Sequence, residues 1–156
     1  MIIVIHNVRS THNVGSIFRT ADAAGVTQVI LTGYTPTPTD RFGRKRKDIA
    51  KTALGAEDTI PWTHYSTLAE AVRVLRAGGY TVFAIEQDSE SLTYTEPHYD
   101  QLTTAFICGN ETEGLTQEEC ALADTIVEIP MHGVKESLNV AVAVGIVLFE
   151  ARRGSV

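Results

Sequence analysis

The stretch TTAFICGNETEGLT, residues 103–116, decides the fold class, because an apolar run passes directly into a glycine-containing loop. The run is rich in β-branched and aromatic residues, which is typical of a short buried strand. A phosphate-binding loop would continue from its last glycine into Lys and then Ser or Thr. Here Gly114 is followed by Leu and Thr, and the loop carries two carboxylates, Glu111 and Glu113. These side chains would repel a phosphate, which leaves open what the loop holds.

Strands and helices alternate along the chain on both sides of this stretch. Apolar, β-branched runs indicate further strands at residues 2–6, 27–32, 80–86 and 125–130. Helical patterns occupy residues 13–24, 66–77, 116–122 and 137–152. This alternation predicts an α/β fold with a mostly parallel sheet flanked by helices. Ligands of such sheets bind outside the carboxyl ends of the strands, which is where the acidic glycine loop lies.

Three of these helices carry specific expectations. The second begins at Ser66, or at Thr67 with a capping box to Glu70. The third has the same capping-box spacing between Thr116 and Glu119. The fourth is apolar on nearly every side, which predicts that it is buried.

The region 33–50 interrupts the alternation and is predicted to be a long exposed loop, because it combines prolines and Gly43 with a run of charge. The chain has a net charge of −6, yet six of its 13 Lys and Arg residues fall between positions 41 and 51, at Arg41, Arg44, Lys45, Arg46, Lys47 and Lys51. An acidic body with one basic segment can attract a polyanion locally, although a solvated charged surface gives the same pattern.

Length and composition place the chain among ordinary globular proteins. At 156 residues it is expected to form one domain, residues 1–156, with a core that needs no disulfide. The two cysteines are expected to be reduced, buried thiols. No segment has the length of a membrane span and no signal pattern occurs, so we expect a cytoplasmic protein with no membrane partner. The histidines and cysteines lack metal-ligand spacing and neither GxSxG nor GxGxxG is present, so no metal is expected.

Three polar clusters remain as candidate sites. HNVGSIFRTADAAG, residues 12–25, contains Asn13 and Arg19 in a helical pattern of small and apolar residues. The second cluster is the acidic glycine loop. The third, IPMHGVKESLNVAVAVG at residues 129–145, brings Ser137 and Asn139 to the entry of an apolar helix. Taken singly, each has an ordinary structural explanation, namely a solvated arginine, a polar turn and helix caps.

Taken in order, the three clusters are far more specific. The patterns N-x-G-x-x-x-R-T-A-x-x-x-G, G-N-E-x-x-G-L and I-P-M-x-G-x-x-E-S-L-N-V resemble the SpoU (TrmH-like) family of RNA ribose methyltransferases, in the SPOUT superfamily. The resemblance covers about Asn7 to Arg153. It implies a SPOUT-type domain with a C-terminal trefoil knot, which is an exception to ordinary unthreaded topology. It also implies a homodimer that uses S-adenosyl-L-methionine to methylate a ribose 2′-hydroxyl of tRNA or rRNA.

The resemblance assigns roles to residues of all three clusters. The cofactor would be bound by Gly109, Asn110, Glu111, Gly114, Ile129, Pro130, Met131, Ser137, Leu138 and Asn139. The implied catalytic group is Arg19, Asn13, Glu111, Ser137 and Asn139. This cofactor carries a sulfonium cation and no phosphate, which agrees with a glycine loop that lacks lysine.

Arg19 is expected to contact the RNA phosphate beside the target ribose, because a guanidinium with a pKa above about 12 is a poor general base. Glu111 is expected to fix its own loop, or to organise Arg19 or Asn13 across the site. Further RNA contacts are expected from Arg9 and from the basic residues between positions 41 and 51.

The RNA target stays open at this stage. Ala141 stands where many relatives have serine, and no further RNA-binding segment flanks the motifs, so tRNA is expected ahead of rRNA. The alternative is an RNA-binding or assembly protein that has the fold without catalysis. A P-loop nucleotide-binding protein is nearly excluded by the missing lysine, and a small-molecule methyltransferase would leave the basic segment unexplained.

Overall fold

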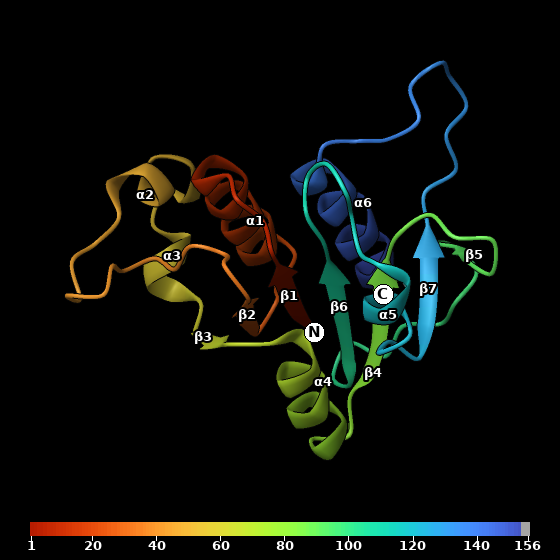
Figure 1. Ribbon diagram of the computed structural model, residues 1–156, viewed down its shortest axis with the longest axis horizontal. Helices are drawn as coiled ribbons and strands as arrows, with labels where there is room; N and C mark the ends of the chain where they lie inside the picture. Colours follow the sequence, from red (N-terminus) through yellow and green to blue (C-terminus); the bar gives the residue numbers. More distant parts are fainter. Residues whose placement is uncertain (154–156) are drawn as a thin grey trace.

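A computed structural model describes residues 1–153 and contains one seven-stranded sheet in which every pairing is parallel. Its strands are β1 (Ile2–His6), β2 (Gln28–Thr32), β3 (Trp62–Tyr65), β4 (Thr81–Ile85), β5 (Leu92–Thr93), β6 (Thr104–Cys108) and β7 (Thr125–Glu128). They are ordered β3-β2-β1-β6-β4-β7-β5 (Figure 1). The predicted α/β class and parallel sheet are confirmed.

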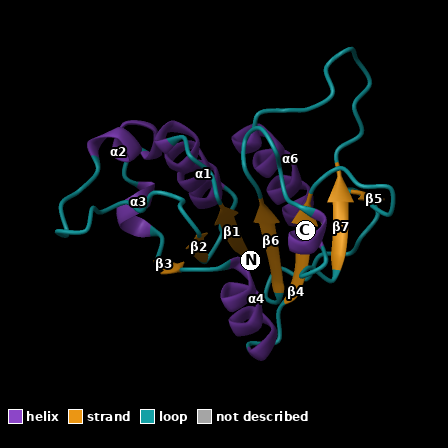
Figure 2. Ribbon diagram, viewed as in Figure 1, coloured by secondary structure: helices purple, strands orange, loops and turns teal. Residues whose placement is uncertain are grey.

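Helices cover both faces of this sheet (Figure 2). They are α1 (Thr11–Ala23), α2 (Lys47–Ala53), α3 (Ala56–Thr59), α4 (Leu68–Ala77), α5 (Gln117–Cys120) and α6 (Val140–Arg153). Successive strand residues point to opposite faces and therefore build two cores. Ile3 and Ile5 of β1 belong to the core that contains α1, α2 and α6, whereas Ile2 and Val4 belong to the core that contains α4.

The direction in which strands are added reverses between β1 and β6. Strands β2 and β3 extend the sheet on one side of β1, and the chain then crosses through α4 to form the other side. Loops that leave β1 and β6 consequently diverge at the carboxyl edge of the sheet, where α/β folds hold their ligands. Residues 7–10 and 109–114 are these loops.

Local hydrogen bonds explain where α4 and α5 begin. Thr67 Oγ1 accepts a hydrogen bond from the Glu70 backbone N–H at 3.2 Å, so Thr67 rather than Ser66 is the N-cap of α4. In α5 the predicted capping box is confirmed, because Thr116 and Glu119 each accept a hydrogen bond from the backbone N–H of the other.

Two strands, β3 and β5, and two helices, α2 and α3, lie outside the predicted elements. The edge strands β3 and β5 lack the continuous apolar runs of the central strands. The predicted loop over 33–50 is also only partly a loop, because α2 begins at Lys47. Both cysteines are buried and free, as predicted.

The last helix departs furthest from its prediction. It begins at Val140, three residues later than predicted, because Asn139 caps its first turn by accepting hydrogen bonds from the backbone N–H groups of Ala141 and Val142. The prediction that it is buried on nearly every side is wrong. Val142 is 50% exposed and Phe149 is 52% exposed.

Candidate active site

A cavity of about 200 Å³ opens at the carboxyl ends of β4, β6 and β7. The loop after β6 forms one wall, and the segment that leads from β7 into α6 forms another. Eight of the ten predicted cofactor-binding residues line the cavity: Gly109, Asn110, Glu111, Gly114, Ile129, Met131, Ser137 and Leu138. Pro130 and Asn139 lie in the same segment and do not line it.

Two glycines allow the loop after β6 to fold tightly against itself. A Cβ atom on Gly109 would lie 2.7 Å from the Gly114 carbonyl carbon, which is too close for a real contact. Gly114 has a φ of +65°, and a Cβ there would lie 2.2 Å from Glu86 Oε2. That oxygen accepts a hydrogen bond from the Leu115 backbone N–H at 2.8 Å, so Glu86 fixes the end of the loop.

Glu111 lines the cavity, and its carboxylate is held by residues at the start of α1. Its carboxylate accepts hydrogen bonds from the backbone N–H groups of Arg9 (3.1 Å) and Ser10 (2.9 Å) and from Asn13 Nδ2 (3.2 Å). Partial burial alone would raise the pKa of this carboxyl, but the hydrogen bonds from Ser10, Arg9 and Asn13 lower it below its ordinary value. Glu111 is therefore a carboxylate that joins its loop to the loop after β1.

Asn13 connects this contact to the third sequence cluster. Its Oδ1 accepts a hydrogen bond from Asn139 Nδ2 at 3.2 Å, while its Nδ2 donates to Glu111. The chain of contacts Glu111–Asn13–Asn139 thus joins one residue from each of the three clusters, across sequence separations of 98 and 126 residues. We refer to it below as the three-motif contact.

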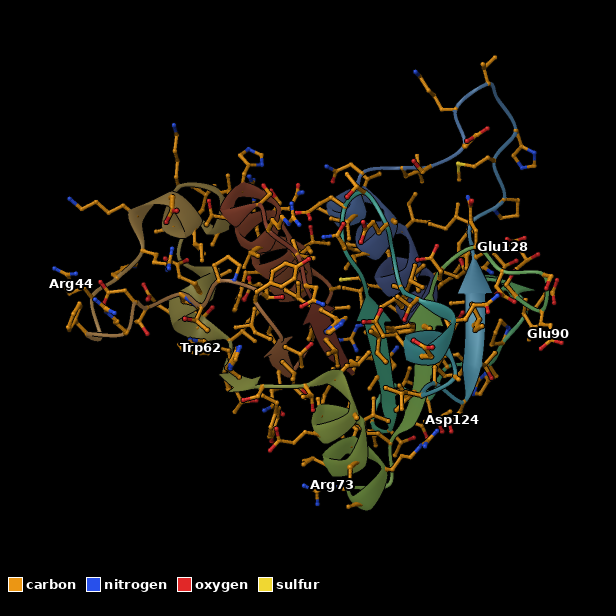
Figure 3. All side chains as sticks on the ribbon, viewed as in Figure 1. Arg44, Trp62, Arg73, Glu90, Asp124 and Glu128 are labelled. Carbon is orange, nitrogen blue, oxygen red and sulfur yellow. The ribbon has the colours of Figure 1, made fainter. Side chains whose placement is uncertain are left out.

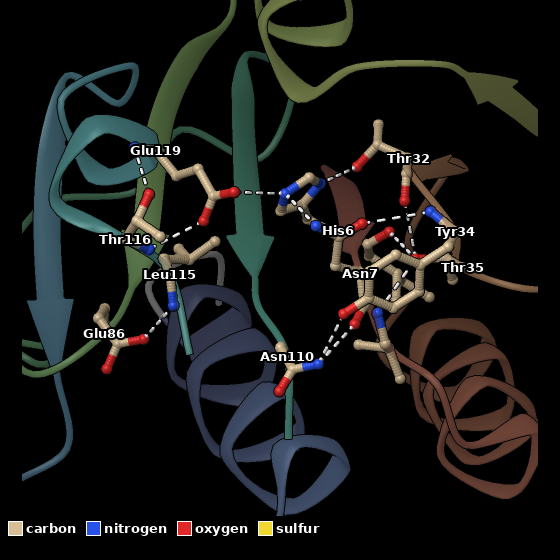
Figure 4. A network of polar contacts seen from close by, with 12 residues as sticks. His6, Asn7, Thr32, Tyr34, Thr35, Glu86, Asn110, Leu115, Thr116 and Glu119 are labelled. Atoms are coloured by element: carbon tan, nitrogen blue, oxygen red, sulfur yellow. Dashed lines mark hydrogen bonds and ion pairs between the residues drawn. The ribbon is translucent and has the colours of Figure 1, made fainter. Parts of the chain in front are cut away.

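Asn110 is held by residues that sequence reasoning missed (Figure 4). Its Nδ2 donates to the Asn7 carbonyl at 3.1 Å and to the Tyr34 hydroxyl at 2.8 Å. Its Oδ1 accepts hydrogen bonds from the backbone N–H groups of Thr112 and Glu113. The loop is therefore tied at its start by a backbone carbonyl that follows β1 and by a side chain that follows β2. These are the positions at which a parallel sheet presents its ligand-binding groups.

The network continues into the opposite core through His6 (Figure 4). His6 is buried, with Nδ1 2.8 Å from Thr32 Oγ1 and Nε2 2.8 Å from Glu119 Oε1. The capping residue of α5 is thereby tied to the ends of β1 and β2. This histidine supports the loops from behind and does not line the cavity.

The cavity is anionic. Glu86, Glu113 and Glu128 line it together with Glu111, and apolar walls come from Ile85, Ile129 and Leu138. Glu86 and Glu128 lie at the carboxyl ends of β4 and β7, and that position was the signal by which the sequence could have identified them. A pocket with these walls suits a cation attached to an apolar or aromatic body and disfavours phosphate.

Arg19 does not line this cavity. It lies six residues beyond Asn13 on α1, exposed, in a shallow surface hollow shared with Lys51, Leu54 and Phe149. The structure therefore brings Asn13, Glu111 and Asn139 together and leaves Arg19 of the same chain apart from them. Ser137 lines the cavity and is exposed.

The predicted RNA-binding residues are mostly exposed, and two of them form ion pairs. Arg9, Arg41, Arg44, Lys45, Lys47 and Lys51 are exposed, and Arg46 is half-buried. Lys45 pairs with Glu57 and Asp58, which raises the pKa of its ammonium group, and Arg44 pairs with Asp40. Lys45 is thus a tether between this segment and α3 as well as a surface charge.

Two negative findings apply to residues 1–153. No helix in this range combines the length and hydropathy needed to cross a membrane. Across the same residues, His, Cys, Asp and Glu side chains form no group of three or more that could hold a metal ion.

Comparison with known proteins identifies the family. Residues 1–149 match the model of the SpoU rRNA Methylase family. The chain is 35% identical over 156 residues to the 23S rRNA (guanosine-2′-O-)-methyltransferase RlmB of Neisseria meningitidis serogroup B, covering 98% of this chain and 58% of that protein. It is also 35% identical to the tRNA (guanosine(18)-2′-O)-methyltransferase of Thermus thermophilus, covering 97% of this chain and 73% of that protein.

A solved structure shows the same arrangement. The AdoMet-bound rRNA methyltransferase of Sinorhizobium meliloti superposes with a TM-score of 0.87 at 35% identity, over 99% of this chain and 56% of that one. The chain spans 58% of the length of the rRNA methyltransferase relatives that it matches. Sequence and fold agree that this chain belongs to the SpoU rRNA Methylase family.

Proposed function

We propose that this chain transfers a methyl group from S-adenosyl-L-methionine to a ribose 2′-hydroxyl of RNA. The observation that carries the proposal is the three-motif contact, which joins the family's three clusters at the edge of an anionic pocket. Matched relatives named as 2′-O-methyltransferases of rRNA and of tRNA support the reaction type. Because both kinds of relative match, the proposal covers both RNA classes.

The pocket fits S-adenosyl-L-methionine by its chemistry. Gly109 and Gly114 let the loop fold tightly beside the pocket. Ile129 and Leu138 offer apolar walls, and the carboxylates of Glu113 and Glu128 suit a positively charged ligand. Met131 and Ser137 line the same pocket. When bound, the cofactor supplies an activated methyl group on a sulfonium, so that no metal is needed to activate the donor.

The polar groups around the pocket would orient the acceptor. Asn13 and Asn139 are joined at the edge of the pocket. Glu111 holds the start of α1 in place by accepting hydrogen bonds from backbone N–H groups there. Arg19 would bind the phosphate next to the target ribose and favour alkoxide character at the 2′-oxygen. The proton would leave to water or phosphate, since a guanidinium does not accept it.

The position of Arg19 supports a site shared between two copies of the chain. Leu54, 65% exposed, and Phe149 line the hollow that holds Arg19. Monomeric proteins rarely expose large apolar side chains together, so we propose that this face is covered in a homodimer. Arg19 of one copy would then serve the pocket of the other. Mixing Arg19→Ala chains with Asn139→Ala chains should restore methyl transfer in the mixed dimer, and failure to restore it would contradict a shared site.

We also propose the SPOUT-type trefoil knot, a single domain over residues 1–156 and a cytoplasmic location. Residues of the loop after β6 line one cavity with Val140 and Ala143 of α6, and α6 packs in the core beside α1. This arrangement supports a chain end that passes beneath the loop.

The competing function is RNA binding without catalysis. An assay separates the two functions. The protein is incubated with labelled S-adenosyl-L-methionine and with size-fractionated RNA from cells that lack this protein. The proposal predicts label in one RNA fraction, reduced at least about 100-fold by Arg19→Ala. Cofactor and RNA binding with no label in any fraction would favour the non-catalytic function.

A further inference from the structure

An exposed aromatic side chain stands at the outer end of the segment between β2 and α2. Phe42 is 66% exposed, although it is a large apolar residue that normally packs inside. Figure 3 shows its neighbour Arg44 at the outermost end of this arm, away from the sheet. The core therefore gives no reason for an aromatic ring at this position.

The turn that carries Phe42 is held by its own hydrogen bonds. Asp40 Oδ1 accepts hydrogen bonds from the backbone N–H groups of Phe42 (2.8 Å) and Arg44 (2.9 Å). The Asp40 and Arg44 main chains are also joined, at 2.8 Å, and Gly43 supplies the left-handed φ of +77°. Lys45 then fastens the base of the turn to Glu57. Phe42 is thus presented outward by a built turn.

Two guanidinium groups flank the ring. The Cζ atoms of Arg41 and Arg44 lie 4.7 Å and 5.0 Å from the ring centroid, in cation–π contact. Arg44 is fixed, because its Nε donates to Asp40 Oδ2 at 2.8 Å. Arg41 forms no ion pair with any side chain of residues 1–153 and can leave the ring.

We propose that Phe42 is a stacking platform for an unpaired nucleobase of the RNA substrate, with Arg41 moving from the ring to a neighbouring phosphate. The inference rests on the proposed function, because it takes RNA as the substrate. An exposed ring beside cationic side chains is how proteins bind single-stranded nucleic acid without reading its sequence. A base in a continuous duplex is already stacked on its neighbours and cannot use the ring. The platform therefore selects RNA with an unpaired loop or end.

Charge argues against a second copy of the chain as the occupant. Two copies meeting at Phe42 would bring four guanidinium groups together, of which Asp40 neutralises only one in each copy. RNA instead supplies both a π-face and the anion that Arg41 lacks.

The test compares binding of two RNA probes at one salt concentration. The first is a pool of stem–loops with randomised loop sequence, and the second is the stem alone as a fully paired duplex. Phe42→Ala should weaken stem–loop binding on the order of tenfold and leave duplex binding unchanged. Phe42→Tyr, which keeps the ring, is the matched control and should bind as the wild type does. Because Phe42 is exposed, none of these changes should alter the fold.

Fluorescence distinguishes stacking from mere proximity. In a Trp62→Phe, Phe42→Trp double variant the only indole stands at the platform. Its emission should be quenched by the stem–loop pool and unchanged by the duplex.

The outcomes separate this inference from the proposed function. Equal stem–loop binding by wild type and Phe42→Ala, with methyl transfer intact, would overturn the platform alone. No binding of either RNA by the wild type would overturn both. A change of Phe42→Ala from dimer to monomer in sedimentation would assign the ring to contact between copies and would also overturn the platform.

Discussion

At the scale of single residues, Glu111 has a structural task that its place in a glycine loop does not reveal. Both of its carboxylate oxygens accept hydrogen bonds from the start of α1. An acidic residue near a cofactor pocket is easily taken for a ligand of the cofactor's positive charge. Glu113 and Glu128 line the same cavity and are better placed for that role, because the carboxylate of Glu111 is engaged by Arg9, Ser10 and Asn13.

Glu111 predicts how stability depends on acid. Its pKa in the folded protein is lowered, so its contribution to stability is present above its ordinary pKa and is lost as the pH falls through the lowered value. Glu111→Gln should reduce the melting temperature at neutral pH. As the pH falls, the melting temperature of the variant should decrease less than that of the wild type. Thermal melts of both proteins between neutral and acidic pH measure this. Parallel curves for the two proteins would show that Glu111 is not the responsible group.

Substitutions at Gly114 and Gly43 separate the cost of backbone strain from the cost of a steric clash. Gly114→Ala must adopt a left-handed φ and displace Glu86, whereas Gly43→Ala adopts a similar φ with no atom within 4 Å. We expect Gly43→Ala to lower the free energy of unfolding by about 1 kcal/mol and Gly114→Ala by roughly 2 kcal/mol or more. Urea denaturation gives both values. Equal losses would mean that Glu86 yields without cost.

At the scale of elements, much of the fold could be predicted because hydrophobic pattern and caps are local signals. Central strands such as β1 and β6, buried on both faces, appear as continuous apolar runs. The edge strand β3 reads WTHY and is largely polar, so its pairing with β2 depends on the sheet already being present. The apolar pattern alone does not show where α6 begins, because the start is set by Asn139, which caps the helix and also donates a hydrogen bond to the distant Asn13.

The sequence left open whether Ser66 or Thr67 caps the N-terminus of α4, and substitutions at the two positions test this. Thr67→Ala removes the hydrogen bond to Glu70 and should lower the free energy of unfolding by about 1 kcal/mol. Ser66→Ala, one residue earlier, should change it by less than about 0.5 kcal/mol. Chemical denaturation of the two variants provides the comparison. A larger loss at Ser66 would place the cap one residue earlier.

At the scale of the whole molecule, the sequence could predict which residues belong to the candidate site but not how the fold arranges them. The motifs identify Asn13, Glu111 and Asn139, and the fold brings them together. No sequence pattern shows that Arg19 faces away from its own pocket, because helical phase is relative to neighbours that are distant in sequence. The exposed face of α6 could not be predicted either, because the sequence pattern of an apolar helix is the same whether its own chain or a partner chain covers it.

The proposed dimer predicts a specific disruption. Phe149→Asp should place a charge in the covered face, shift the protein to monomer in sedimentation and abolish methyl transfer, because Arg19 would lose its partner pocket. Leu92→Asp, on edge strand β5 and 42% exposed, is the control and should leave both unchanged. An active monomeric Phe149→Asp protein would exclude the shared site.

The central claim is methyl transfer to the ribose, and the position of the label within the RNA tests it most directly. A methyl group on the 2′-oxygen blocks the attack on the neighbouring phosphate by which alkali cleaves RNA. RNA labelled by this protein and hydrolysed in alkali should therefore yield the label in dinucleotides that resist cleavage, and Asn13→Ala should reduce that label in step with total transfer. Label released entirely as mononucleotides would show methylation of a base and would contradict the account.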